Sequence, residues 1–175
     1  MTLERVLLTL ATLAFGAGIS WLMLRGWRSR QGRQADLPAP PVPPAVPGDL
    51  VAGSVSGLFV GTTSAEDWLD RIAVHGLAHR APVELVLRTD GVWFERDGAD
   101  DLFLPYSSVR TAVVGDALAG KVVGKGGLLL VDWVLGGRLL TTGFRADDHG
   151  THRRLADAIT AHLPTEPTGP FEEAS

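Results

Sequence analysis

The hydrophobic pattern divides the chain into one unbroken apolar run and a longer region in which apolar and polar positions alternate. The run from Val6 to Leu24 contains no charged side chain. An α-helix rises about 1.5 Å per residue, so this run, extended by Leu3 and the long stem of Arg25, crosses the ~30 Å hydrocarbon core of a bilayer. A helix satisfies its own backbone polar groups in lipid. The pattern therefore predicts one transmembrane helix over residues 3–25.

The alternative for this run is a cleaved signal peptide, which has a basic start, a shorter apolar core and a small-residue cleavage site. Here Glu4 stands beside Arg5, and arginines follow the run directly. An anchor fits these features better. The residues expected at the membrane interface are Trp21, Arg25, Trp27, Arg28, Arg30 and Arg33. The excess of arginine after the helix predicts that the C-terminal side faces the cytoplasm, from the inner (cell) membrane.

Two stretches of biased composition flank the region of alternating pattern. Residues 26–48 are first basic and then contain six prolines, which predicts an extended polyproline-II linker. A PxxP ligand for an SH3-type partner is the alternative for these prolines. Residues 164–175 are polar and acidic and are predicted to be a disordered tail. One domain is left, over residues 49–163, which is an ordinary size for a single domain.

Within that domain, alternation and turn residues predict short β-strands. The expected strands are 51–60, 81–89, 92–96, 102–105, 109–114, 128–135 and 138–144. Asp90-Gly91 and Gly136-Gly137 favour tight hairpin turns. The first strand is expected to end in a turn at 61–63, followed by a short helical turn over 64–70.

The last element predicted in the domain is an amphipathic helix. Asp147 or Asp148 is expected to cap it, and Leu155, Ala156 and Ile159 fall on one face. The whole pattern predicts a mainly β fold, a small barrel or sandwich closed by a C-terminal helix.

Composition narrows the functions open to this domain. Residues 49–163 carry fifteen Asp and Glu against eleven Lys and Arg, and such an acidic module is a poor binder of nucleic acid. The chain contains no cysteine, which excludes disulfides, thiolate chemistry and cysteine-based zinc sites.

The segments Asp101–Val114 and Gly127–Asp148, with the helix after them, resemble the second half of a bacterial PH-like domain. Over residues 3–163 the chain resembles a family of small bacterial membrane proteins with one N-terminal anchor, a proline-rich linker and a PH-like domain. Members are sometimes labelled transporters or export proteins. The resemblance implies a PH-like fold and a binding module, whereas a single helix cannot build a translocation path.

The glycine-rich stretch 115–127 is the main candidate for ligand binding. Residues 115–122 nearly match the nucleotide-binding P-loop, but Val122 replaces the hydroxyl residue that would hold Mg²⁺, and no helix-forming sequence follows. Lys121 and Lys125 remain candidates for contact with an anion or lipid, in a stretch that is otherwise expected to be a mobile surface loop. In eukaryotic PH domains a basic motif between the first two strands grips phosphoinositides, and that pattern is not reproduced here.

Other polar clusters do not predict chemistry. His75 and His79, and the cluster of Asp148, His149 and His152, do not supply the three or four converging ligands that a metal needs. No catalytic residue and no cofactor is expected. Trp68, on a turn, is the one aromatic residue expected to contact a partner.

The function predicted from these features is a membrane-anchored PH-like binding or scaffolding module. Its partners are expected to be the lipid bilayer, through the helix, and a protein held at an exposed barrel edge or in a groove beside the closing helix. Two alternatives stay open: a membrane-tethered enzyme or nucleotide-binding domain that uses residues 115–127, and an accessory subunit of a transport or envelope complex. The oligomeric state is left open.

Overall fold

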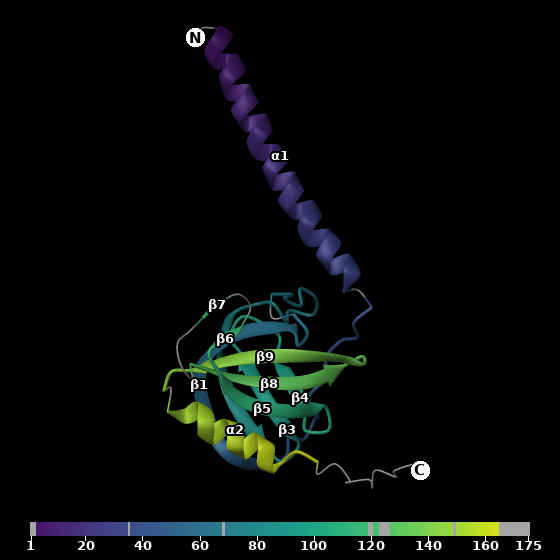
Figure 1. Cartoon of the computed structure of the whole chain (residues 1–175), viewed down its shortest axis with the longest axis vertical. Helices are drawn as coiled ribbons and strands as arrows, with labels where there is room; N and C mark the ends of the chain where they lie inside the picture. Colours follow the sequence, from purple (N-terminus) through teal and green to yellow (C-terminus); the bar gives the residue numbers. More distant parts are fainter. Residues whose placement is uncertain are drawn as a thin grey trace, which may run out of the picture. The chain divides into compact units, whose positions relative to one another are not determined.

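The structure is a computed structural model, and it describes residues 3–34, 36–67, 69–118, 121–122, 127–148 and 150–164. The chain divides into two compact units, Met1–Leu37 and Pro38–Ser175. Figure 1 shows the first unit as one long helix and the second as a sheet with a helix packed on it.

The first unit is the apolar helix α1, Leu3–Arg33. Its stretch Leu7–Arg25 has a mean hydropathy of 1.9 and is long and apolar enough to cross a membrane. Within that stretch, Thr9, Thr12 and Ser20 each donate a hydrogen bond to the carbonyl four residues earlier, at 2.8–2.9 Å. The prediction of an apolar helix is confirmed, and the helix continues beyond residue 25 into the basic segment.

The second unit is built on a seven-stranded antiparallel sheet with the order β4-β3-β2-β1-β9-β8-β5. The strands are β1 (Leu50–Ser64), β2 (Ala81–Arg88), β3 (Gly91–Arg96), β4 (Leu102–Pro105), β5 (Val109–Gly115), β8 (Leu128–Leu135) and β9 (Arg138–Ala146). A small separate pair is formed by β6 (Ala117–Leu118) and β7 (Lys121–Val122). The mainly β prediction is confirmed, although the sheet is not closed into a barrel.

The two edge strands of the sheet, β4 and β5, are consecutive in the chain. Only three residues, 106–108, connect β4 to β5, so these ends of the opposite edges lie near each other. The helix α2, Thr151–Ala161, packs mainly on β5 and also on β8 and β9 (Figure 1). The predicted closing helix is therefore present, against the open side of the sheet.

β1 does not end where the sequence suggested. The expected turn at 61–63 is wrong, because the strand continues to Ser64 through a bulge between Phe59 and Gly61. Gly61 has φ +131°, a backbone conformation that glycine adopts without strain, and a bulge can absorb it inside a strand. The helical turn expected over 64–70 is also absent from the described residues there, which are bends and a turn.

The core contains aromatic rings and, beside them, a cluster of buried hydrogen bonds. Phe94 meets the edges of Phe59 and Phe144, with ring centroids 5.7 and 6.4 Å apart. Beside these rings, Trp133 Nε1 donates to Thr142 Oγ1 at 2.9 Å, and that oxygen lies 2.8 Å from Thr62 Oγ1. Because all these side chains are buried, the bonds tie β1, β8 and β9 together at one place.

The start of α2 differs from the prediction. Its N-cap is Gly150, with no side-chain cap, rather than Asp147 or Asp148. Asp148 still supports the approach to the helix, since its carboxylate accepts from Gly150 N at 3.0 Å and from Thr151 Oγ1 at 3.1 Å. Capping depends on the backbone conformation at a single residue, which the spacing of acids does not specify.

Candidate functional site

A groove runs between α2 and the first half of β1, and we call it the α2 groove. Its lining residues are Ala52, Gly53 and Val55 from β1, with Thr151, Arg154, Leu155 and Ala158 from α2. Its volume is about 260 Å³. Every lining side chain is apolar or small except Thr151 and Arg154. The groove is therefore an apolar trough with one cation at its rim.

The backbone along this groove is an open strand edge. β1 pairs with β2 over Leu50–Phe59 but with β9 only from Gly57 to Ser64. In the described part of the chain, no strand pairs with residues 50–55 on the side opposite β2. Backbone donors and acceptors at a free edge can accept a further strand. An apolar trough and an unpaired edge thus lie side by side.

The helix side of the groove is held firmly in place. His152 is buried, and its Nε2 accepts a hydrogen bond from the Ala146 backbone N–H at 2.9 Å. Leu155, Ala156 and Ile159 are buried beneath the helix. These contacts fix α2 relative to the end of β9, so the groove is a preformed feature of the fold.

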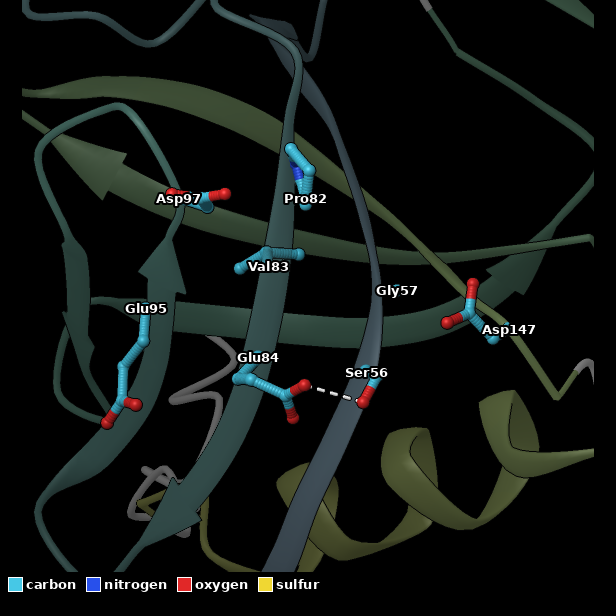
Figure 2. A pocket seen from close by; sticks show the side chains of 8 residues that line it. All are labelled: Ser56, Gly57, Pro82, Val83, Glu84, Glu95, Asp97 and Asp147. Atoms are coloured by element: carbon cyan, nitrogen blue, oxygen red, sulfur yellow. Dashed lines mark hydrogen bonds between the residues drawn. The ribbon is translucent and has the colours of Figure 1, made fainter.

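A second cavity, of about 240 Å³, is strongly acidic (Figure 2). Its lining includes the carboxylates of Glu84, Glu95, Asp97 and Asp147, and no lysine or arginine is among its described lining residues. Glu84 lies opposite Glu95 in the β2–β3 register, and it accepts a hydrogen bond from Ser56 Oγ at 2.5 Å. Like charges on facing strand positions repel, so this face disfavours anions.

A third pocket involves part of the stretch that was predicted to be an extended polyproline-II linker. Residues 39–43 line it together with His75, Arg96, Asp100, Asp101 and Leu102. Arg96 donates to the carbonyls of Gly76 and Asp100 at 2.9 and 2.6 Å, and its guanidinium lies 4.7 Å from the centre of the Phe59 ring. Burial lowers the pKa of Arg96, and the carboxylates of Asp100 and Asp101 act in the opposite direction. Arg96 thus has a structural role here.

Tyr106, in the β4–β5 connection, is a buried titratable group with a raised pKa. Burial raises the pKa of its phenol to about 12, and the charge of Asp90 adds to this effect. Its ring stacks on His162, just beyond α2, with centroids 5.4 Å apart. The hydroxyl has no hydrogen-bond partner among the described residues. This side chain anchors the far end of α2, away from the groove.

The residues predicted to contact membrane, anion or partner fall mostly outside what the structure describes in detail. In α1, Arg25 Cζ lies 5.6 Å from the centre of the Trp21 ring. The other predicted interface residues, Trp27, Arg28, Arg30 and Arg33, lie on the C-terminal part of the same helix. Lys121 lies on β7. Lys125 and Trp68 lie outside the described residues.

The histidines in the described part of the chain are not gathered into a metal site. Among the described residues, no group of three or more His, Asp or Glu side chains could hold a metal ion. His149 lies outside the described residues. His152 instead serves the backbone of β9, through the bond to Ala146.

The sequence suggested a groove beside the closing helix but not the residues that form it. The length of β1 could have indicated the unpaired edge. β1 runs from Leu50 to Ser64 and is longer than either neighbouring strand, β2 or β9. A strand of fifteen residues cannot be paired along its whole length by partners of eight and nine. This length was not recognised from the sequence, because the glycine and threonines at 61–63 predicted a turn that would end the strand there.

Of the comparisons with known proteins, a match to a family model agrees with this architecture. The family model described as "Bacterial PH domain-like" matches residues 37–160, and the chain belongs to that family. No curated protein matches. A chain of the solved structure described as "The 8S snRNP Assembly Intermediate" is similar at 10% sequence identity, covering 78% of this chain and 97% of that one, with a TM-score of 0.47. At that score the likeness carries no inference about function.

Proposed function

We propose that this protein is a membrane-anchored binding module whose PH-like domain holds a protein partner at the cytoplasmic face of the bacterial inner membrane. The observation that carries the proposal is the α2 groove beside the open edge of β1. α1 supplies the anchor, and the arginines that follow its apolar stretch favour the cytoplasmic orientation. PH-like domains are generally non-catalytic, and the proposal requires no catalysis.

The groove fits an extended protein segment better than a small molecule. Its volume of about 260 Å³ lies below the roughly 300–1,000 Å³ typical of small-molecule sites. An extended segment paired with residues 50–55 gains main-chain hydrogen bonds along its length. Alternate side chains of the segment then enter the trough and provide specificity.

Single-cysteine variants test the groove directly, because the chain has no cysteine of its own. A benzophenone attached to Ala52→Cys or Ala158→Cys should crosslink, in membranes supplied with cytosol, to the same segment of one protein. Asp157→Cys is the matched control, since Asp157 is an exposed neighbour of Ala158 on α2. A synthetic peptide of the crosslinked segment should bind the purified chain, and Ala158→Arg should abolish that binding.

Equal crosslinking from Asp157→Cys, or a crosslinked peptide that binds Ala158→Arg unchanged, would contradict the groove proposal. The enzymatic alternative makes a different prediction, in which Lys121→Ala abolishes a measurable turnover. Partner capture that survives this substitution, with no turnover, would argue against it.

Orientation is tested with Ser175→Cys and a membrane-impermeant maleimide. We expect the thiol to be protected in intact cells and labelled once the cells are opened. Labelling of intact cells would place the domain on the outer side of the membrane, and the partner would then have to be sought there.

A further inference from the structure

We infer that residues 165–175, which follow α2, occupy the α2 groove in cis and compete with the protein partner for it. The segment reads Thr-Glu-Pro-Thr-Gly-Pro-Phe-Glu-Glu-Ala-Ser. It contains one large apolar side chain, Phe171, and three acidic side chains without a basic one. The inference rests on the proposed function, because the segment would compete with the proposed protein partner for the same groove.

Charge selects the α2 groove among the three cavities described. The cavity of Figure 2 is lined by four carboxylates and would repel an acidic segment. The pocket beside the proline-rich stretch contains two aspartates as well as Arg96. The α2 groove has Arg154 as its charged lining residue and no acidic one among its described lining residues.

The segment is long enough to reach. The chain leaves α2 near Leu163, and Leu155 lies eight residues back along the helix, which is about 12 Å at 1.5 Å per residue. Seven residues from Thr165 to Phe171 span up to roughly 23 Å when extended. Phe171 can therefore return to Leu155 with length to spare.

This placement brings the aromatic side chain of the segment to the apolar part of the groove and its acidic side chains to the arginine at the rim. With Phe171 in the apolar trough beside Leu155, the next two residues, Glu172 and Glu173, come within reach of the Arg154 guanidinium at the rim. Arg154 is exposed, and the hydrogen bond that it donates is a long one, 3.3 Å to Thr151 Oγ1, so it can turn to a carboxylate. Because the segment is tethered, its local concentration at the groove is on the order of millimolar, enough for a weak contact to persist.

The test uses the full chain in lipid nanodiscs, with Ala158→Cys as a reporter inside the groove. The measured quantity is the rate of reaction with a maleimide. Removal of residues 165–175 should raise this rate roughly tenfold, as expected for releasing one buried phenyl ring, and Phe171→Ala should give most of that increase. Asp157→Cys, outside the groove, should react at the same rate with and without the segment.

Two neighbouring arginines on α2 provide a test variant and a matched control for the contact between Arg154 and the acidic segment. Arg154→Ala should raise the rate about two- to fivefold, the range of an exposed ion pair. Arg153→Ala, which removes an exposed arginine that does not line the groove, should leave it unchanged. In the chain that lacks residues 165–175 the effect of Arg154→Ala should vanish, since the two changes remove the same contact.

An unchanged rate after removal of the segment would overturn the inference, as would an equal effect of the two arginine variants. The crosslinking experiment separates this result from the proposed function. Partner crosslinks at Ala158→Cys that persist, unenhanced, without the segment would leave the groove function standing and the competition refuted. Strong protection by the segment with no partner crosslink after its removal would support the cis contact and refute partner binding.

Discussion

The two halves of β1 belong to one strand but have opposite surroundings. The second half, Gly57–Ser64, pairs mainly with β9 and contributes Phe59 and Thr62 to the core. The first half, 50–55, pairs with β2 alone among the described strands, and its other edge borders the α2 groove. The difference shows how a PH-like fold can leave part of a strand edge unpaired without weakening its core, because the buried contacts and the unpaired edge lie on different parts of one strand.

The largest expected effect comes from removing a core side chain in the paired half. Phe59→Ala should lower the free energy of unfolding by about 3–5 kcal/mol, the range for a buried phenylalanine, since the ring is fully buried against Phe94. Leu50→Ala is the control in the open half, where the side chain is 62% exposed. Urea unfolding of the full chain in detergent, followed by tryptophan fluorescence, gives both values, and similar losses would refute the division of β1.

Two glycines on β1 sharpen the same comparison by adding one methyl group. A Cβ on Gly57 would lie 2.4 Å from the Arg145 carbonyl oxygen and under 3 Å from the Phe144 ring. Gly57→Ala should therefore destabilise the fold by about 1–3 kcal/mol through overpacking. A Cβ on Gly53 would meet nothing within 4 Å, so Gly53→Ala should leave the unfolding midpoint close to that of the unsubstituted chain. A loss of unfolding free energy from Gly53→Ala as large as that expected for Gly57→Ala would contradict the assignment of an open edge.

The buried hydroxyl pair at the paired half gives an effect of intermediate size. Thr142→Val keeps the shape but leaves Trp133 Nε1 and Thr62 Oγ1 without their partner. The expected loss is about 1–3 kcal/mol. Ser56→Ala breaks a bond between exposed side chains, to Glu84, and should change the unfolding free energy by less than about 0.5 kcal/mol. Equal losses from both variants would show that burial does not decide the effect.

The last effect is confined to alkaline pH and is absent under ordinary conditions. The folded-state pKa of Tyr106, about 12, lies above the ordinary value of about 10. The unfolded chain thus loses this proton first, and the stability that the phenol contributes below about pH 10 is lost as the pH rises toward 12. Tyr106→Phe should flatten this loss.

Tyr106 is the chain's one tyrosine, so ultraviolet absorbance titrates it without interference. A midpoint near 10 in the folded protein would contradict its burial. Because Tyr106 lies at the far end of α2 from the groove, occupation of the groove should leave the midpoint unchanged.

Regular strands were predictable because their signals are local. Alternating side chains correctly gave the β2–β3 hairpin, although its turn lies one residue earlier than predicted, at residues 89–90, and Gly91 already belongs to β3. The predicted turn at Gly136-Gly137 connects β8 to β9, and both glycines have a positive φ. The start of α2 was predicted less well, since Gly150 caps it in place of an aspartate. No comparable local pattern supported the choice of two lysines and one tryptophan as candidate site residues.

The sequence by itself determined the apolar helix, the order of the strands along the chain and the closing helix, since each follows from the period of its own side chains. The tertiary structure decided that β1 continues through Gly61, because a bulge there lets Thr62 join the buried hydroxyl pair. It also decided where β1 loses its second partner and which face of α2 lies beside that edge. These depend on how far each neighbouring strand extends and on packing between residues about 100 positions apart, and no local pattern contains that information.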